Sequence, residues 1–177
     1  MTVKVRYKCL NCGICCNRLL IDRQGVRKGL PLLPDEVHIF ETKKVKQAIG
    51  IGVAPDDGDF EIILYQMTEN SCPYHVKDGC SMWVFRATVC RAYPVMPVIN
   101  SDKSVVLAYD FSCTALEKYQ SKYSDDKIPW DMDSISREAK NARKLSSITE
   151  RVVSEIDRAW IFDLKFEKWY PFSQLTE

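Results

Sequence analysis

The sequence lacks the features that would place the chain in a membrane or on nucleic acid. Its longest apolar runs are a few residues, far below the ~20 that a membrane-spanning helix needs. Residues 1–8 alternate charged residues with valine and form no apolar signal core. The 25 Lys and Arg residues are balanced by 24 Asp and Glu, which leaves no broad basic surface to follow a phosphate backbone. We therefore expect a cytoplasmic protein with no membrane and no nucleic-acid partner.

Common enzyme motifs are also missing. The chain has no glycine loop that cradles phosphate, no Rossmann glycine fingerprint, no H-E-x-x-H pair and no G-x-S-x-G nucleophile elbow. Seven glycines and eight prolines in 177 residues exclude a collagen-like or low-complexity chain, and 46% hydrophobic residues are enough for a core. These observations leave open whether the protein is an enzyme.

What the sequence does have is a cluster of cysteines. Four of its eight cysteines lie within eight residues, as Cys9-x-x-Cys12-Gly-x-Cys15-Cys16. Cysteines three residues apart can direct their sulfurs at one centre, and three at this interval share the spacing of the bacterial ferredoxin run. Gly13 can adopt a positive φ beside a crowded centre. Because the side chains of Cys15 and Cys16 diverge, either they serve two centres or one of them is a spare.

The other four cysteines are dispersed along the chain: Cys72, Cys80, Cys90 and Cys113. All eight cysteines are candidate metal ligands, and disulfides are the alternative, although they are rare in a reducing compartment. For Cys113 the ligand and core interpretations both stay open, because a lone cysteine is among the most commonly buried residues. His75, in Cys72-x-x-His75, has the spacing of a zinc ligand.

Four pieces of the sequence resemble, in order, the signature of the CxxCxxCC cysteine-cluster proteins. They are the Cys9–Cys16 run, Cys72-Pro73-Tyr74, Asp78-Gly79-Cys80-Ser81-Met82-Trp83, and Arg86-Ala-Thr-Val-Cys90-Arg91-Ala-Tyr93-Pro94. These proteins are described as zinc- or iron-chelating domains, and the same block is similar to the cysteine-rich part of flagellin lysine N-methylases. The resemblance covers about half of the chain. It implies metal ligands among the cysteines up to Cys90, with Arg86 and Arg91 as their companions.

Cations are expected beside such ligands, since a four-thiolate centre carries a net charge of about −2. Four flank the cysteines in sequence and are candidates for neutralising the centre and hydrogen bonding to sulfur: Lys8, Arg18, Arg86 and Arg91. Ordinary surface salt bridges are the alternative. Cys16 is a further candidate for a reactive thiol, because ligation of Cys15 would hold it near this positive charge.

The cysteine spacing favours an iron–sulfur cluster, of the 4Fe-4S type, over zinc. Zinc sites usually pair two Cys-x-x-Cys knuckles, whereas here a single close run is followed by dispersed cysteines, which suits the larger cubane. Zinc stays the alternative cofactor, because thiolates bind both metals. Three functions follow: an iron–sulfur protein with a redox role or a role in modifying a macromolecule, a zinc-stabilised non-catalytic adaptor for a protein partner, or a metal carrier.

The hydrophobic patterns predict an α+β fold with a small mixed sheet, irregular cysteine-rich metal loops and a long C-terminal helix. Alternating residues predict a strand at 2–7, and a second strand is expected at 18–22. A run rich in Ile, Leu and Tyr predicts a strand at 60–67, and a hairpin of 95–99 with 104–109 is expected. Helices are predicted at 35–47, at 86–92, and from Asp133 or Ser134 to Phe162, the last with an apolar stripe.

We expect a single domain, 1–177, in which a metal-binding region, 1–117, is covered by a helical region, 118–177. The aromatic tail at 160–172 is expected to be buried against the metal-binding region. In the adaptor interpretation, this tail and the C-terminal helix instead bind the partner.

Overall fold

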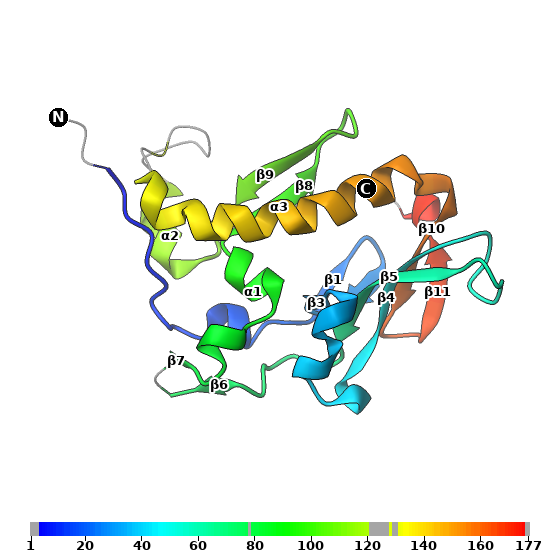
Figure 1. The fold of residues 1–177 in the computed structure, drawn as a ribbon, viewed down its shortest axis with the longest axis horizontal. Helices are drawn as coiled ribbons and strands as arrows, with labels where there is room; N and C mark the ends of the chain where they lie inside the picture. The colour runs from blue at the N-terminus through cyan, green and yellow to red at the C-terminus, as the bar shows by residue number, and fades with distance from the viewer. Residues whose placement is uncertain (1–3, 78, 121–127, 129–130, 176–177) are drawn as a thin grey trace. The chain divides into compact units, whose positions relative to one another are not determined.

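The computed structural model describes residues 4–175 except 78, 121–127 and 129–130. It combines helices with several small sheets, so the predicted α+β class is confirmed (Figure 1). The chain forms two compact units. Unit 1 comprises Met1–Cys15 and Tyr74–Thr149, and unit 2 comprises Cys16–Pro73 and Glu150–Glu177. The chain therefore passes from one unit to the other near residues 15, 73 and 149. The boundary expected from the sequence, between the metal-binding and helical regions, was at residue 117.

Unit 2 is built on a five-stranded sheet. Its strand order is β11 (Lys168–Pro171), β10 (Ala159–Asp163), β4 (Val45–Ile51), β5 (Glu61–Met67) and β3 (Pro31–Leu32). Each pairing is antiparallel, where a mixed sheet was expected. The predicted strand at 60–67 is confirmed as β5, and the one at 18–22 is shifted to β1 (Ile21–Arg23), which pairs with β2 (Val26–Lys28).

The helix predicted at 35–47 is wrong. The chain instead makes two short 3-10 turns, η2 (Pro34–Ile39) and η3 (Thr42–Lys44), and β4 begins at Val45. The predicted helix had few apolar positions and so no continuous stripe to bury. The segment from Val45 to Ile51 carries β-branched residues, which pack well on a sheet, and Gly50 lets the ring of Phe60 approach where a Cβ would collide with it.

The long helix is confirmed but ends earlier than predicted. Helix α3 (Met132–Ser154) has 23 residues and is followed by η6 (Ile156–Arg158) and by β10, so the expected end at Phe162 is wrong. The sequence Trp160-Ile-Phe162 is aromatic and β-branched, and antiparallel pairing with β4 and β11 outweighs helix propagation there. Within α3, four residues of the predicted stripe are buried: Ile135, Ala142, Leu145 and Val152.

The aromatic tail packs within unit 2. Trp169 on β11 meets the rings of Phe60 and Phe162 edge to face, at centroid distances of 5.1 and 5.3 Å. Such pairs add to the free energy gained by burial. The indole of Trp160 donates a hydrogen bond to the Gly52 carbonyl oxygen. The tail therefore contributes to the core of its own unit, while Phe166 in the turn between β10 and β11 stays exposed.

Unit 1 contains the predicted hairpin, formed by β8 (Val95–Ile99) and β9 (Val105–Tyr109). Its other elements are short: β6 (His75–Val76), β7 (Gly79–Cys80), η4 (Trp83–Phe85), α1 (Thr88–Ala92) and α2 (Thr114–Gln120). The helix expected at 86–92 is confirmed as α1. Of the strand expected at 2–7, residues 1–3 lie outside the described residues, and Val5 makes only an isolated bridge.

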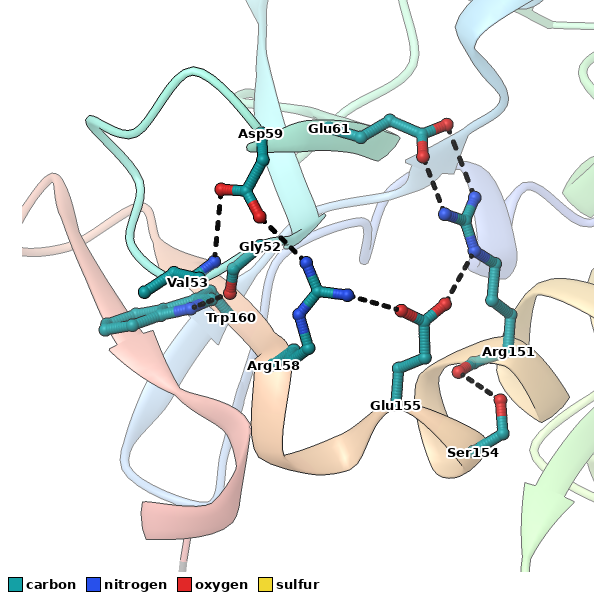
Figure 2. A network of polar contacts seen from close by, with 9 residues as sticks. All are labelled: Gly52, Val53, Asp59, Glu61, Arg151, Ser154, Glu155, Arg158 and Trp160. Atoms are coloured by element: carbon teal, nitrogen blue, oxygen red, sulfur yellow. Dashed lines mark hydrogen bonds and ion pairs between the residues drawn. The ribbon is translucent and has the colours of Figure 1, made fainter.

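A chain of ion pairs joins the end of α3 to the sheet of unit 2 (Figure 2). The Arg151 guanidinium donates to both carboxylate oxygens of Glu61, at 2.6 and 3.3 Å, and to Glu155 at 3.1 Å. The Arg158 guanidinium lies 2.8 Å from Asp59 and 3.5 Å from Glu155. Together these partly exposed pairs hold the end of the helix against the sheet, although each pair contributes little free energy alone.

Replacing Arg151 with alanine is expected to lower the free energy of unfolding by about 1 kcal/mol at low salt, because solvent screens these pairs. In the wild type, the hydrogen bond from Arg151 lowers the pKa of the Glu61 carboxyl. The stabilisation is therefore present above the ordinary pKa of 4.5 and is lost as the pH falls through the lower pKa of the folded protein. Urea denaturation measures both effects. The control is Arg143→Ala at an exposed position of the same helix, and equal losses in the two variants would contradict the prediction.

Candidate metal centre

Cys9 and Cys12 lie on an irregular loop of unit 1, and Cys15 lies in the 3-10 turn η1 (Ile14–Cys16) that follows it. The loop turns at Asn11 and Gly13, whose φ angles are 54° and 74°. The positive φ expected at Gly13 is confirmed, and Asn is among the few other residues that adopt this conformation readily. Cys9 is half-buried, while Cys12 and Cys15 are exposed. The three thiols thus lie at the surface of unit 1.

Cys113 stands immediately before α2. Its carbonyl oxygen accepts hydrogen bonds from the backbone N–H groups of Leu116, at 2.7 Å, and Glu117, at 3.0 Å. Burial raises the pKa of the Cys113 thiol, and the backbone N–H groups of Ala115 and Leu116 lower it in part. The start of the helix therefore fixes the backbone of Cys113 and brings N–H donors toward its sulfur, as is common for sulfur that binds metal.

The structure brings Cys113 to the N-terminal loop. Cys12 Sγ lies 3.6 Å from Thr114 Oγ1, across a sequence separation of 102 residues. Burial is the largest cause that raises the pKa of the Cys113 thiol, and nearby Cys15 and Cys9 raise it further. Cys9, Cys12, Cys15 and Cys113 therefore lie in one neighbourhood of unit 1, without forming a group that could hold a metal ion as they stand.

Two tyrosines border this group of thiols. The Tyr7 hydroxyl donates to the Tyr93 carbonyl oxygen at 3.5 Å, and the Tyr93 hydroxyl lies 3.2 Å from Ser112 Oγ. Burial raises the pKa of both phenols, and the neighbouring cysteines Cys113 and Cys15 raise both further. Both phenols therefore favour the neutral form in the folded protein.

Replacing Tyr93 with phenylalanine is expected to remove one tyrosine that ionises late in an ultraviolet pH titration. Because the folded pKa is raised above the ordinary 10.0, the stabilisation from the neutral phenol is present below pH 10 and is lost as the pH rises above it. The denatured protein, in which all eight tyrosines ionise together, is the reference. The prediction fails if Tyr93→Phe leaves the late-ionising fraction unchanged.

The other four cysteines are distributed over both units. In unit 1, Cys80 on β7 pairs with His75 on β6, and Cys90 lies on α1. In unit 2, the Cys72 backbone N–H donates to the Cys16 carbonyl oxygen at 2.7 Å. The structure thus brings Cys16 and Cys72 together and assigns the adjacent Cys15 and Cys16 to different units.

The four predicted cations have different surroundings. Arg86 donates from Nε to the Trp83 carbonyl oxygen at 3.2 Å, and its guanidinium lies 3.8 Å from the centroid of the Trp83 ring. Lys8 lines the same cavity as Cys9. Arg91 donates to Thr88 Oγ1 at 3.2 Å, and Arg18 is exposed in unit 2. Their role in neutralising a centre stays a prediction.

Several residues near the thiols were not predicted as site residues from the sequence. Cys9 Sγ lies 3.7 Å from Asn11 Oδ1, and Glu138 and Trp83 line a cavity beside Cys9. A signal for Glu138 did exist, since it lies three residues after Ile135 and so places a carboxylate beside the apolar stripe of α3. Thr114 had no comparable signal, because its contact depends on tertiary structure.

Within residues 4–175, as far as they are described, no three Cys, His, Asp or Glu side chains form a group that could hold a metal ion. None of the eight cysteines, all of which belong to the described part, forms a disulfide. The described helices include none with the length and apolar character required to cross a membrane.

No family model, no curated protein and no solved structure matches the chain. The resemblance to cysteine-cluster proteins therefore stays a prediction from the motifs quoted above.

Proposed function

We propose that the protein binds a metal centre through Cys9, Cys12, Cys15 and Cys113, and that the centre is an iron–sulfur cluster of the 4Fe-4S type. The observation that carries this proposal is the position of Cys113, which supplies a fourth thiol beside a run of three. The 3.6 Å approach of Cys12 to Thr114 supports that position, as do the effects of Cys15 and Cys9 on the pKa of Cys113.

The donor chemistry fits this class of centre. Four thiolates bind iron–sulfur clusters and zinc alike, and the N–H groups of Ala115 and Leu116 would hydrogen bond to the coordinated Cys113 sulfur. Because these thiols do not form a preassembled site for a single ion, binding would order the exposed side chains of Cys12 and Cys15 as it proceeds. A cubane needs a wider set of ligands than one ion does, which favours the cluster.

The role that follows is redox chemistry or the modification of another macromolecule. When bound, a cluster of this type supplies one-electron transfer, while the chain orients it and controls access of water. We place the protein in the cytoplasm as part of the same proposal, because thiolate ligands persist in a reducing compartment.

The test is anaerobic purification of the full chain, followed by visible absorption and analysis of iron, zinc and acid-labile sulfide. We expect a brown protein with near-equal iron and sulfide, about four of each per chain. A colourless protein with stoichiometric zinc and no sulfide would overturn the iron–sulfur assignment and favour the zinc-stabilised adaptor. Absence of both metals after reconstitution would overturn metal binding itself.

A further inference from the structure

A cavity of about 250 Å³ adjoins Cys9 in unit 1. Tyr7, Tyr93 and Trp83 supply aromatic walls, and Glu138 and Arg86 supply opposite charges. Pockets for drug-sized ligands usually exceed this volume, so the cavity has room for a small molecule only.

One oxygen of the Glu138 carboxylate lacks a hydrogen-bond partner in this cavity. This atom, Oε2, is buried and makes no hydrogen bond. Burial raises the pKa of the Glu138 carboxyl, whereas a hydrogen bond to its own backbone and the positive charges of Arg137 and Arg86 lower it. A buried acceptor without a donor costs free energy, and a ligand that donates a hydrogen bond would recover it.

The cations of the cavity are available for a negative group. Arg86 is held in place by its hydrogen bond to the Trp83 carbonyl oxygen and by the Trp83 ring beneath its guanidinium. That arrangement uses Nε and leaves the other guanidinium nitrogens for a ligand, since a guanidinium has five N–H donors. Lys8, exposed at the same cavity, adds a second positive charge.

We infer that this cavity binds a small zwitterion, with the ammonium and carboxylate groups of a free α-amino acid. The ammonium group donates to Glu138 Oε2, the carboxylate pairs with Arg86 and Lys8, and the remaining atoms lie against the tyrosine rings. The inference goes beyond the proposed function, because none of these contacts requires a metal. Since Cys9 also lines the cavity, an occupied cavity would place this ligand beside the proposed centre.

The first test compares ligands by isothermal titration calorimetry on the full chain. The probes are glycine, L-leucine and L-phenylalanine, each with its N-acetyl and carboxamide derivatives, which lack one of the two charges. We expect saturable binding of at least one amino acid at one per chain, with both of its derivatives bound at least about tenfold more weakly. Absence of saturable binding up to about 10 mM would overturn the inference and leave water as the occupant.

The second test assigns each charge to its residue. Glu138→Gln is expected to weaken binding of the amino acid about tenfold and to remove its preference over the N-acetyl derivative. Arg86→Gln is expected to remove the preference over the carboxamide. Glu150→Gln, the same change at an exposed position of α3, is the control.

Unchanged binding in Glu138→Gln would overturn the assignment, and circular dichroism verifies that each variant is folded. The wild-type comparison of derivatives keeps the inference falsifiable if a variant does not fold. Metal analysis of the same samples distinguishes failure of this inference from failure of the proposed function. Amino-acid binding is expected whether or not the metal centre is present.

Discussion

Replacing Cys113 with serine is expected to abolish the metal content of the anaerobically purified protein. Cys113 is the fourth thiol of the proposed centre, beside Cys9, Cys12 and Cys15, and stands immediately before α2. A serine hydroxyl is a poor ligand for iron–sulfur clusters and for zinc, both of which favour thiolate. Iron, zinc and sulfide analysis with visible absorption measures the loss.

Two matched variants make this result specific. Cys9→Ser is expected to lose the centre to the same extent, because it removes a thiol from the same group. Ser112→Ala changes the neighbouring residue and its contact with Tyr93, and is expected to retain the centre. If Cys113→Ser keeps its metal while Cys9→Ser loses it, the fourth ligand has been assigned wrongly.

Removal of the metal is expected to increase the hydrogen exchange of residues 9–16 by about a hundredfold or more. In this segment Gly13 is buried, while the exposed residues include Cys12 and Cys15, so apolar packing supplies little of its order. Ligation would supply the rest, since metal binding and folding are coupled when the site is not preassembled. Hydrogen–deuterium exchange with mass spectrometry, on samples with and without a chelator, measures the change.

The reference segments are the β4 and β5 strands of unit 2, which pair over most of their length. Their exchange is expected to be unaffected by the chelator. Equal acceleration in both places would mean that the metal stabilises the whole chain, and no acceleration at 9–16 would mean that the loop is ordered without it.

The strands that were predicted well carry local patterns. The run of Ile, Leu and Tyr between Glu61 and Met67 and the two apolar arms of the β8–β9 hairpin specify strands from neighbouring residues alone. The helix predicted at 35–47 was wrong because the segment has no continuous apolar stripe, and from Val45 the chain pairs with β5. The prediction that α3 extends to Phe162 was wrong because β10 pairs with the distant strand β4. The antiparallel order of the five-stranded sheet likewise depends on contacts that no local pattern encodes.

In the candidate site, too, the features set by local sequence were predicted and those set by tertiary contacts were not. The spacing of Cys9, Cys12 and Cys15 indicated three thiols from one loop, and the positive φ of Gly13 agrees with it. The position of Cys113 beside that loop could not be predicted, because a lone cysteine carries no spacing signal. The cavity with Glu138 and Trp83 was also out of reach, since it joins residues from separate parts of unit 1.

Diffraction from anaerobically grown crystals, recorded at the iron and zinc absorption edges, tests most directly whether four particular thiols share one centre. We predict an anomalous peak enclosed by the sulfur atoms of Cys9, Cys12, Cys15 and Cys113. A peak bound by other residues, with Cys113 outside its coordination sphere, would contradict the assignment.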